Sequence, residues 1–402
     1  MLMAIAAGLT VALSACGGGA APAGGPLALY TWVSSQSDRQ QWESFISEAK
    51  KVDPTLDVTI DGPSFEDYWT KVKTRLSGSD TPCLLTTQSA RAQELGSLLM
   101  PLDDLAKANG YDLSKVDKSM LAGMTVDGTL RAIPYDAEPI VLFYNADSFA
   151  KAGIAPPGLT YSREQFIADA KKLTTPDHKA LAITPGIFIP AAWATAGDAS
   201  WLSADKKLNL ADPAFVAQVQ SYFDLVSKEG IAAAPNPADT SDVFDQQFTS
   251  GAVDMMIQGP WMYGTYDEAA SFTLGVTVVP SPSGQARGMT AGSGFGIAAN
   301  CNRPDEAFKA IVALTSTPVQ EALATSRGIV PARAEALPAW GKGKVPGAAD
   351  TVSALLQNAT AQVTTPTWNQ VETLMTQYGV EGYRGQRSAA DIMQTIQNSV
   401  GG

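Results

Sequence analysis

Cysteine is the residue of this chain whose setting points most directly to a chemical reaction. Cys16 ends the run Leu13-Ser-Ala-Cys16, which follows an apolar stretch over Leu2–Leu13 and precedes three glycines. That stretch is shorter than the ~20 apolar residues of a membrane-spanning helix, and it is typical of a signal peptide, although no Lys or Arg precedes it. The pattern resembles a bacterial lipobox, so we expect a signal peptide over 1–15, a diacylglyceryl group on the Cys16 thiol, and a flexible tether over 16–26.

Few other side chains could bind a metal or act as a nucleophile. Cys83 and Cys301 remain as an even pair, in the oxidising compartment that a lipoprotein would occupy. His178 is the single histidine of the sequence, and we expect it to be a solvated residue in a loop. Four nitrogen or sulfur ligands for a structural zinc ion are therefore not available. The sequence predicts no metal site and no cofactor.

Composition limits the class of partner. The 402 residues leave enough chain for two domains after the leader, and the 45% hydrophobic content is typical of a globular protein. The formal net charge of −12 argues against a nucleic-acid partner and against a polybasic membrane-binding surface. Beyond residue 16, the sequence has no segment long and apolar enough to span a membrane.

Apolar periodicity predicts the elements that must position the remaining polar and aromatic residues. The first part alternates strand and helix, which favours a parallel sheet with helices on both faces. Its first helix should begin at Ser37, in the capping box Ser37-x-x-Gln40. The predicted segments are strands at 27–32, 56–60 and 83–87, and helices over 37–53 and 65–76.

The second part continues the alternation with clear boundary signals. Asp127-Gly128 predicts a two-residue hairpin turn. Helices should follow the capping residues Ser162 and Asp212, and another should begin near Pro304. The predicted strands are 140–144, 253–258, 272–279 and 294–299.

Four short segments match a family in sequence order and spacing. The chain resembles the carbohydrate-binding solute-receptor lipoproteins of bacterial ABC importers, the group that includes maltose-binding protein. The segments are Ile133-Pro134-Tyr135-Asp136 through Glu138 to Asn145, Gly251 to Gly259-Pro260-Trp261, Gly292-Ser293-Gly294-Phe295-Gly296-Ile297 followed by Ala307-Phe308, and Gly328-Ile-Val-Pro331-Ala-Arg333.

The resemblance implies a fold that composition alone would not indicate. It is the two-lobe α/β fold of type II periplasmic binding proteins, in which each lobe is a mostly parallel sheet flanked by helices. About three crossings would form the hinge, and closure would enclose a ligand between the lobes. Lobe one is expected over 27–135 and 290–330, and lobe two over 136–289 and 331–402.

A sugar has apolar ring faces and a belt of hydroxyls, so its site needs aromatic surfaces and a few placed polar groups. The resemblance implies that Trp261 stacks on a sugar ring and that Glu138 contacts hydroxyls. Trp32 ends the first strand, at an edge where open α/β sheets bind ligands. For Trp32 and Trp368, ligand contact and core packing are equally favoured. Packing is favoured for Trp193, Trp201, Trp42 and Trp69.

The other polar candidates follow strands or lie in the matched segments. Arg91 and Arg333 could contact ligand or form structural salt bridges. The glycine-rich crossing could let backbone approach the ligand or could form a tight turn. The candidates are Gln88, Arg91, Asp136, Asp198, Gly292, Ser293, Gly294 and Arg333.

The resemblance also bears on the two remaining cysteines. Cys83 stands where the family usually has aspartate, and Cys301 lies just past the returning strand. In the family's fold these two strands are antiparallel neighbours. A Cys83–Cys301 disulfide is therefore implied, with two separate buried thiols as the alternative.

The function that the resemblance implies is binding without catalysis. The chain would capture a di- or oligosaccharide and deliver it to ABC permease subunits, as a lipid-anchored monomer on the outer face of the cell membrane. One alternative ligand is a glycerophosphodiester, whose phosphate could bind Arg91 or Arg333. A second alternative is a secreted glycoside hydrolase, which needs two carboxylates facing each other across a bond. Asp136 and Glu138 are the only close pair that we find.

Overall fold

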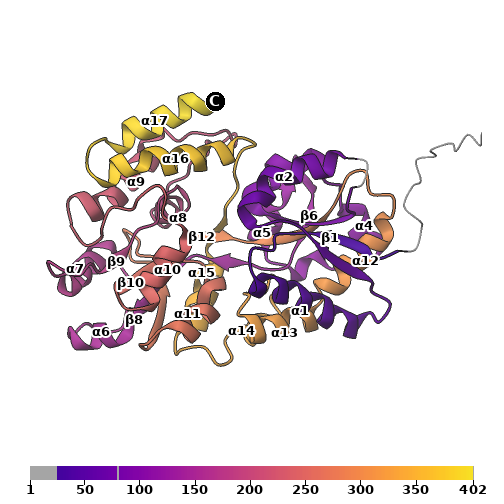
Figure 1. The fold of residues 1–402 in the computed structure, drawn as a ribbon, viewed down its shortest axis with the longest axis horizontal. Coiled ribbons are helices and arrows are strands. Elements are labelled where there is room, and N and C mark those ends of the chain that lie inside the picture. The colour runs from indigo at the N-terminus through magenta and orange to yellow at the C-terminus, as the bar shows by residue number, and fades with distance from the viewer. Residues whose placement is uncertain (1–24, 79–80, 402) are drawn as a thin grey trace, which may run out of the picture.

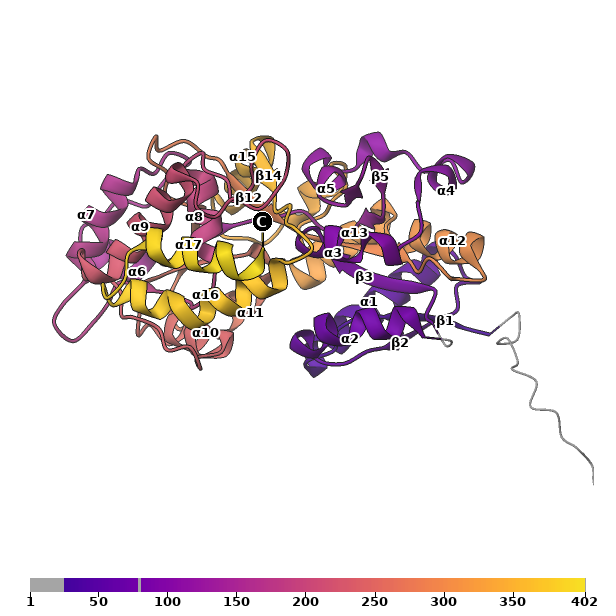
Figure 2. The same cartoon turned by 90° about the horizontal axis from the view of Figure 1, so that it is seen from above.

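The computed structural model describes residues 25–78 and 81–401. The predicted signal peptide, the predicted lipidation of Cys16 and most of the predicted tether lie outside these residues. Figure 1 shows two α/β lobes side by side, with a few strands passing between them. The same division is visible from above in Figure 2. Segments far apart in sequence share a lobe, since the orange helices near residues 304–327 lie among the indigo and purple elements.

Lobe one is built on a five-stranded sheet of order β2-β1-β3-β13-β6. The strands β1, β2 and β3 pair in parallel, whereas β13 pairs antiparallel with both β3 and β6. Buried apolar clusters lie on both faces, one beneath α1 and α12 and one beneath α2. The strands are β1 (Leu27–Tyr30), β2 (Val58–Asp61), β3 (Leu84–Gln88), β6 (Ala132–Pro134) and β13 (Ser293–Ile297).

The helices of lobe one come from two separate stretches of the sequence, one within residues 36–123 and one over 304–327. The α-helices are α1 (Gln36–Val52), α2 (Phe65–Ser77), α3 (Ala92–Leu95), α4 (Asp103–Ala108), α5 (Lys118–Gly123), α12 (Pro304–Leu314) and α13 (Thr317–Arg327). Short 3-10 turns are η1 (Ser89–Arg91), η2 (Gly96–Leu98) and η3 (Leu113–Lys115), and a small hairpin joins β4 (Thr125–Val126) to β5 (Thr129–Leu130). Its turn at Asp127-Gly128 confirms the prediction, with φ values of 49° and 76°.

Lobe two is built on a four-stranded sheet of order β11-β8-β10-β9. Only β9 and β10 pair in parallel, and β8 is antiparallel to both of its neighbours. Both sheets are thus mixed, with one strand in each that runs opposite to the others: β13 in lobe one and β8 in lobe two. The predicted two-lobe α/β fold with mostly parallel sheets is confirmed. The hinge explains these two strands. Each follows directly on a hinge strand, β13 after β12 and β8 after β7, so it runs away from the hinge while its neighbours in the sheet run toward it. The strands are β8 (Val141–Asn145), β9 (Leu181–Ala182), β10 (Met255–Gln258) and β11 (Leu274–Val278).

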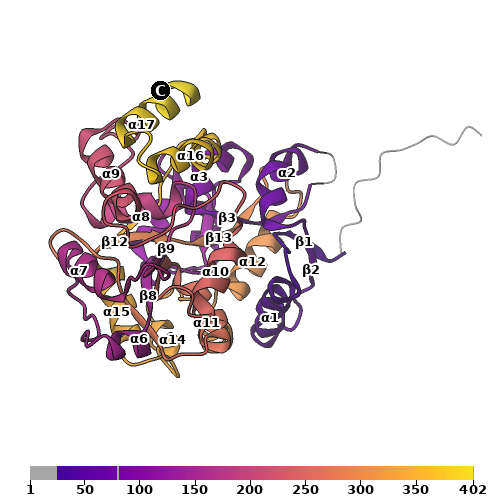
Figure 3. The same cartoon turned by 60° about the vertical axis from the view of Figure 1, so that its left-hand side comes forward.

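Helices surround this second sheet, and α9, α16 and α17 pack together on its outer side in Figures 1 and 3. They are α6 (Ala146–Lys151), α7 (Arg163–Leu173), α8 (Phe188–Ala196), α9 (Pro213–Ser227), α10 (Ser241–Thr249), η4 (Pro260–Met262), α11 (Tyr263–Ala269), α14 (Leu337–Trp340), α15 (Ala348–Gln357), α16 (Trp368–Tyr383) and α17 (Ala389–Val400). Within residues 25–78 and 81–401, no helix is long and apolar enough to cross a membrane.

Three strands of a separate sheet lie at the hinge, in the order β14-β12-β7. They are β7 (Glu138–Pro139), β12 (Gly288–Ala291) and β14 (Ala359–Ala361). The segment around Pro331 also pairs with Asp136. Glycine is required here, because a Cβ on Gly294 would lie 2.8 Å from the Ile133 carbonyl oxygen, and one on Gly292 would lie 2.9 Å from that of Asp136. Neither glycine lies in a turn: Gly294 belongs to β13, and Gly292 is the single residue between β12 and β13.

One helix start differs from its prediction. The N-cap of α1 is Ser35, not Ser37. The Ser35 hydroxyl accepts the Asp38 N–H at 3.1 Å, and the Asp38 carboxylate accepts the Ser34 N–H at 2.8 Å. This reciprocal pair satisfies two amides at the helix start. The apolar residues that recur at helical spacing along α1 are buried: Trp42, Phe45, Ile46 and Ala49.

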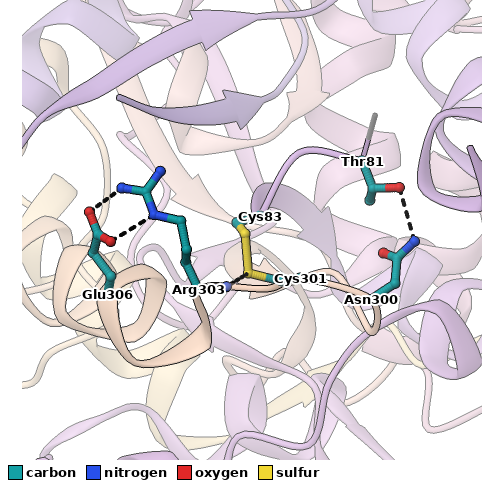
Figure 4. The surroundings of a disulfide bond; sticks show 6 residues. All are labelled: Thr81, Cys83, Asn300, Cys301, Arg303 and Glu306. Carbon is teal, nitrogen blue, oxygen red and sulfur yellow. Dashed lines mark hydrogen bonds and ion pairs between the residues drawn. A yellow bond between two sulfur atoms is a disulfide. The ribbon is translucent and has the colours of Figure 1, made fainter. Parts of the chain in front are cut away.

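The disulfide between Cys83 and Cys301 is confirmed (Figure 4). Leu84 pairs with Ile297 in the β3–β13 ladder, so the residues just outside this pair meet at one end of the two strands. The Cα atoms of the two cysteines are 4.9 Å apart. Beside the bond, the Asn300 side-chain amide donates to the Thr81 hydroxyl at 3.0 Å.

Candidate functional site

The carboxyl ends of β1 and β3 lie at the edge of lobe one that meets lobe two. Trp32 follows β1 and is half-buried against other rings, with centroid distances of 5.4 Å to Phe65 and 5.8 Å to Trp69. Phe65 is 37% exposed at the start of α2, and Trp69 is buried one turn later. These three residues, which we call the lobe-one aromatic cluster, offer flat apolar surface at the edge of the sheet.

Arg91 joins this cluster to lobe two. Its guanidinium lies 5.1 Å from the Trp69 ring and donates to Glu372 at 2.5 Å and to Asn369 at 3.3 Å, both on α16. The Arg91 side chain is only 7% exposed. Burial raises the pKa of Glu372, while the positive charge of Arg91 opposes that rise. We call Trp69, Arg91, Asn369 and Glu372 the interlobe cluster.

A second aromatic surface lies in lobe two, beside the hinge. β10 runs antiparallel to β8 and ends beside the hinge, where Gly259, Pro260 and Trp261 follow it. The Trp261 ring folds over Gly259, where a Cβ would collide with it. Trp261 remains 36% exposed, and Phe188 packs 6.2 Å from it. An indole held by a neighbouring ring and still accessible can stack on an apolar ligand face.

Asp136 and Glu138 lie within the hinge and bind different crossings. The Asp136 carboxylate accepts the Ser293 N–H, and the Glu138 carboxylate accepts the Val330 N–H at 3.0 Å. Both are buried. Burial raises the pKa of Asp136 to about 8, and burial together with the nearby Asp136 raises the pKa of Glu138 well above its ordinary value. The two carboxylates therefore tie the three crossing segments together.

The remaining aromatic candidates are packed. Trp368 has no exposed surface, and its ring centroid lies 5.5 Å from that of Trp201. The Trp201 indole donates to the Val363 carbonyl at 2.8 Å. Trp193 is buried beneath the Arg163 guanidinium, which lies 4.1 Å from its ring. Trp42 and Trp69 are buried, as expected, and Trp340 is buried too.

The other polar candidates have structural partners. Asp198 is exposed and pairs with Arg287. Arg333 donates to the Thr315 carbonyl at 2.6 Å and lies 4.6 Å from the Tyr111 ring, so it packs on lobe one. Gln88 pairs with Ser293 in the β3–β13 ladder, at the edge near Arg91. The structure thus brings Gln88, Arg91, Trp32 and Ser293 to one edge of lobe one, and it places Asp198 and Arg333 with other partners.

His178 differs from its prediction as a solvated residue. Its ring nitrogen lies 2.7 Å from the buried Asp254 carboxylate, and its side chain is 31% exposed. The two residues are 76 positions apart, so only the folded chain shows the pair. Among the described residues, no group of three or more His, Cys, Asp or Glu side chains could hold a metal ion.

Several side chains near the lobe contact were missed from sequence. Phe65, Asn369 and Glu372 were not among the candidates, and Trp69 was assigned to the core alone. Glu372 lies four residues after Trp368 on α16, a spacing that places both on one helix face and could have suggested it. Three buried polar atoms here have no hydrogen-bond partner within residues 25–78 and 81–401: Trp69 Nε1, Glu138 Oε2 and Gln362 Nε2. Buried polar groups are normally hydrogen-bonded, so unpartnered atoms of this kind are exceptions within the protein.

Two α/β lobes joined by a hinge, with aromatic surface at the lobe-one edge and beside the hinge in lobe two, are typical of a two-lobe binding protein, and comparison with known families identifies it further. Residues 47–349 match the model of the bacterial extracellular solute-binding proteins. The match covers well over half of the sequence. The chain belongs to this family.

Curated relatives match only part of the chain. The sn-glycerol-3-phosphate-binding periplasmic protein UgpB of Brucella abortus is 26% identical over 259 residues, which are 58% of this chain and 57% of that protein. The UgpB protein of Rhizobium meliloti is 24% identical over 255 residues, with the same coverage. The chain thus spans just over half the length of the curated relatives it matches.

Solved structures match nearly the whole chain. Lmo0181 from Listeria monocytogenes in complex with cycloalternan has a TM-score of 0.82 at 19% identity, covering 93% of this chain and 97% of that one. Maltose-bound MalE3 from T. maritima has a TM-score of 0.76 at 18% identity, covering 93% and 98%. UgpB from Mycobacterium tuberculosis in complex with glycerophosphocholine has a TM-score of 0.77 at 19% identity, covering 94% and 98%. These likenesses confirm the two-lobe fold.

Proposed function

We propose that this chain captures a di- or oligosaccharide between its lobes and delivers it to the permease subunits of an ABC transporter. The observation that carries the proposal is the presence of aromatic surface in both lobes: the lobe-one aromatic cluster at the edge that meets lobe two, and Trp261 with Phe188 beside the hinge. Sugar rings present apolar faces to such surfaces and hydroxyls to polar groups like those of the interlobe cluster. Two structurally similar proteins, Lmo0181 in complex with cycloalternan and maltose-bound MalE3, support this ligand class.

The site would be divided between the two lobes. We propose lobe one over 27–135 and 290–330 and lobe two over 136–289 and 331–402, with Trp32, Gln88 and Arg91 contributed by the first. Trp261 would stack on a ring from the second, and the free oxygen of Glu138 would accept a hydroxyl. Hinge closure would then enclose the ligand.

The proposal includes the place of the protein in the cell. Cys16 would carry lipid and hold the chain, as a monomer, on the outer face of the membrane, where permease subunits could receive the ligand. No catalysis is proposed. Asp136 and Glu138 each accept a hydrogen bond from a backbone amide of the hinge. This is a structural role, whereas a glycoside hydrolase needs two carboxyl groups that face each other across the glycosidic bond.

Replacing Trp261 with alanine should weaken glycan binding by about 1–3 kcal/mol, because one aromatic contact is lost. Isothermal titration with wild type and variant measures this directly. Tyr378→Ala on α16 is a matched control, since Tyr378 packs beside Arg387 rather than at either aromatic surface. Equal dissociation constants for Trp261→Ala and wild type would remove Trp261 from the site.

A glycerophosphodiester is the second candidate ligand, and the sequence match to UgpB favours it. A thermal-shift panel of mono-, di- and oligosaccharides, sn-glycerol 3-phosphate and glycerophosphocholine separates the two. Ligand at about 100 times its dissociation constant stabilises the folded protein by about 2.7 kcal/mol. A response confined to a glycan series supports the first proposal, and a response to phosphate compounds alone replaces it with the second.

A further inference from the structure

The ion pairs around Arg91 bear on which ligand can bind between the lobes. Besides Glu372 at 2.5 Å, the Arg91 guanidinium has Glu94 at 3.6 Å. Glu94 is itself 2.5 Å from Lys73, whose side chain is 49% exposed. The charge of Arg91 is thus already balanced by carboxylates from both lobes, at a position where both Arg91 and Glu94 are nearly buried.

We propose that Glu372 is a specificity-determining residue: it occupies the Arg91 guanidinium from across the lobes, so the site accepts uncharged polyols and rejects phosphate esters. This inference rests on the proposed function, because it assigns the ligand class of the same site. It assigns a role to a residue on α16, in the lobe opposite to Arg91.

Hydrogen-bond chemistry explains the discrimination. A sugar hydroxyl both donates and accepts, so it can insert between Arg91 and Glu372 and satisfy both at once. A phosphate ester offers acceptor oxygens and negative charge. Its ionised phosphate group would satisfy Arg91 but would face the carboxylates of Glu372 and Glu94 without a proton to donate to either. Like charges in a site of reduced dielectric repel strongly, and buried carboxylates left without a donor are costly.

The setting of Arg91 strengthens this effect. Its side chain is 7% exposed, and the Trp69 ring lies 5.1 Å from its guanidinium, so the arginine cannot swing into solvent to meet an anion elsewhere. Asn369 binds the same guanidinium at 3.3 Å and carries no charge. Glu94 is shared with Lys73, so Glu372 is the carboxylate that holds Arg91 from the opposite lobe.

The test is the variant Glu372→Gln, which keeps the size of the side chain and its acceptor oxygen but removes its charge. We expect it to bind sn-glycerol 3-phosphate at least ten-fold more tightly than wild type in isothermal titration at neutral pH and low salt. Inorganic phosphate serves as the minimal probe. The double variant Arg91→Gln/Glu372→Gln should lose the gain, because the guanidinium that the anion would bind is absent.

Glu381→Gln is the matched control. It lies on the same helix and removes the same charge, but Glu381 pairs with Arg387 at 3.1 Å on an exposed surface. Calorimetric unfolding of each variant checks that it is folded. If Glu372→Gln gains no affinity for phosphate compounds, or if Glu381→Gln gains as much, the specificity role is wrong. Tight phosphate binding by wild type would also overturn it.

Separate titrations distinguish this failure from failure of the proposed function. Wild type titrated with glycans tests the proposed function alone. If wild type binds a glycan and the Glu372→Gln variant gains no phosphate affinity, only the role of Glu372 is overturned. A wild type that binds no glycan beside a variant that gains phosphate affinity overturns the glycan proposal and supports the role of Glu372.

Discussion

Replacing Cys83 and Cys301 together with alanine should lower the free energy of unfolding of lobe one by about 2–5 kcal/mol. The bond closes a sequence separation of 218 residues, which contains all of the lobe-two sheet. Without it, the unfolded chain gains conformational freedom that the native disulfide removes, and a long loop makes this gain large. Scanning calorimetry of the double variant measures the change.

Each lobe has its own buried core, so the two can unfold in separate transitions and must be followed separately. Tryptophan fluorescence in lobe one, where Trp32, Trp42 and Trp69 lie together, reports the affected transition. Wild type treated with reductant should match the double variant, and alkylation with intact-mass analysis counts the released thiols. Identical unfolding midpoints with and without reductant would show that the bond contributes no stability.

Local features of the fold were predictable because they depend on neighbouring residues. The buried stripe of α1 follows from helical periodicity, and the Asp127-Gly128 turn follows from residues that tolerate positive φ. The start of α1 was misplaced because Ser35 and Ser37 both suit an N-cap. Asp38 decides for Ser35, since its carboxylate returns to the Ser34 amide.

Strand direction and site partners were less accessible, because they depend on contacts between distant segments. The alternation of strands and helices by itself predicts parallel neighbours, and only the resemblance implied that β13 pairs antiparallel with β3, as it does. Arg91 was placed at a strand end correctly, but its partner Glu372 lies 281 positions later. No sequence periodicity relates Arg91 to Glu372. The resemblance implied that their two lobes are neighbours, but it did not identify this pair.

The surroundings of the aromatic residues also depend on contacts between distant segments. Trp69 fits a core stripe of α2, and it is buried; its unpartnered Nε1 and its contact with Arg91 become visible only in the folded chain. Trp368 occupies a helix start, where ligand contact and packing were equally favoured, and its full burial against Trp201 is a matter of tertiary packing. Residue type and spacing identify such side chains as candidates, but only the folded chain shows what they contact.

The hinge carboxylates should make the protein less stable as pH rises from about 4 to about 8. An unfolded aspartate has a pKa of about 3.9, whereas burial raises the pKa of Asp136 to about 8 in the folded protein. Between these values the folded protein holds a proton that the unfolded chain has released, so the free energy of unfolding falls with rising pH. The fall should end above the pKa of the folded state. The direction is opposite to that of a salt-bridged carboxylate, whose pKa is lowered.

Asp136→Asn tests this prediction, because asparagine keeps the acceptor for the Ser293 amide and cannot ionise. Relative to the variant, wild type should lose about 2–4 kcal/mol of unfolding free energy between pH 5 and pH 8, within the limit of about 1.4 kcal/mol per pH unit for one proton. Urea unfolding at both pH values measures the difference. Asp104→Asn, at an exposed position on α4, is the matched control.

Few titratable groups interact with the carboxyls of Asp136 and Glu138. Tyr135 is the neighbour whose charge interacts with both carboxyls, and burial raises its own pKa, so it stays neutral over this range. Glu138 should contribute in the same direction, since burial and Asp136 raise its pKa. Because Asp136 holds one crossing and Glu138 another, ionisation would loosen the connection between lobes rather than either lobe alone. If wild type and Asp136→Asn lose stability in parallel from pH 5 to pH 8, the hinge does not hold the extra proton.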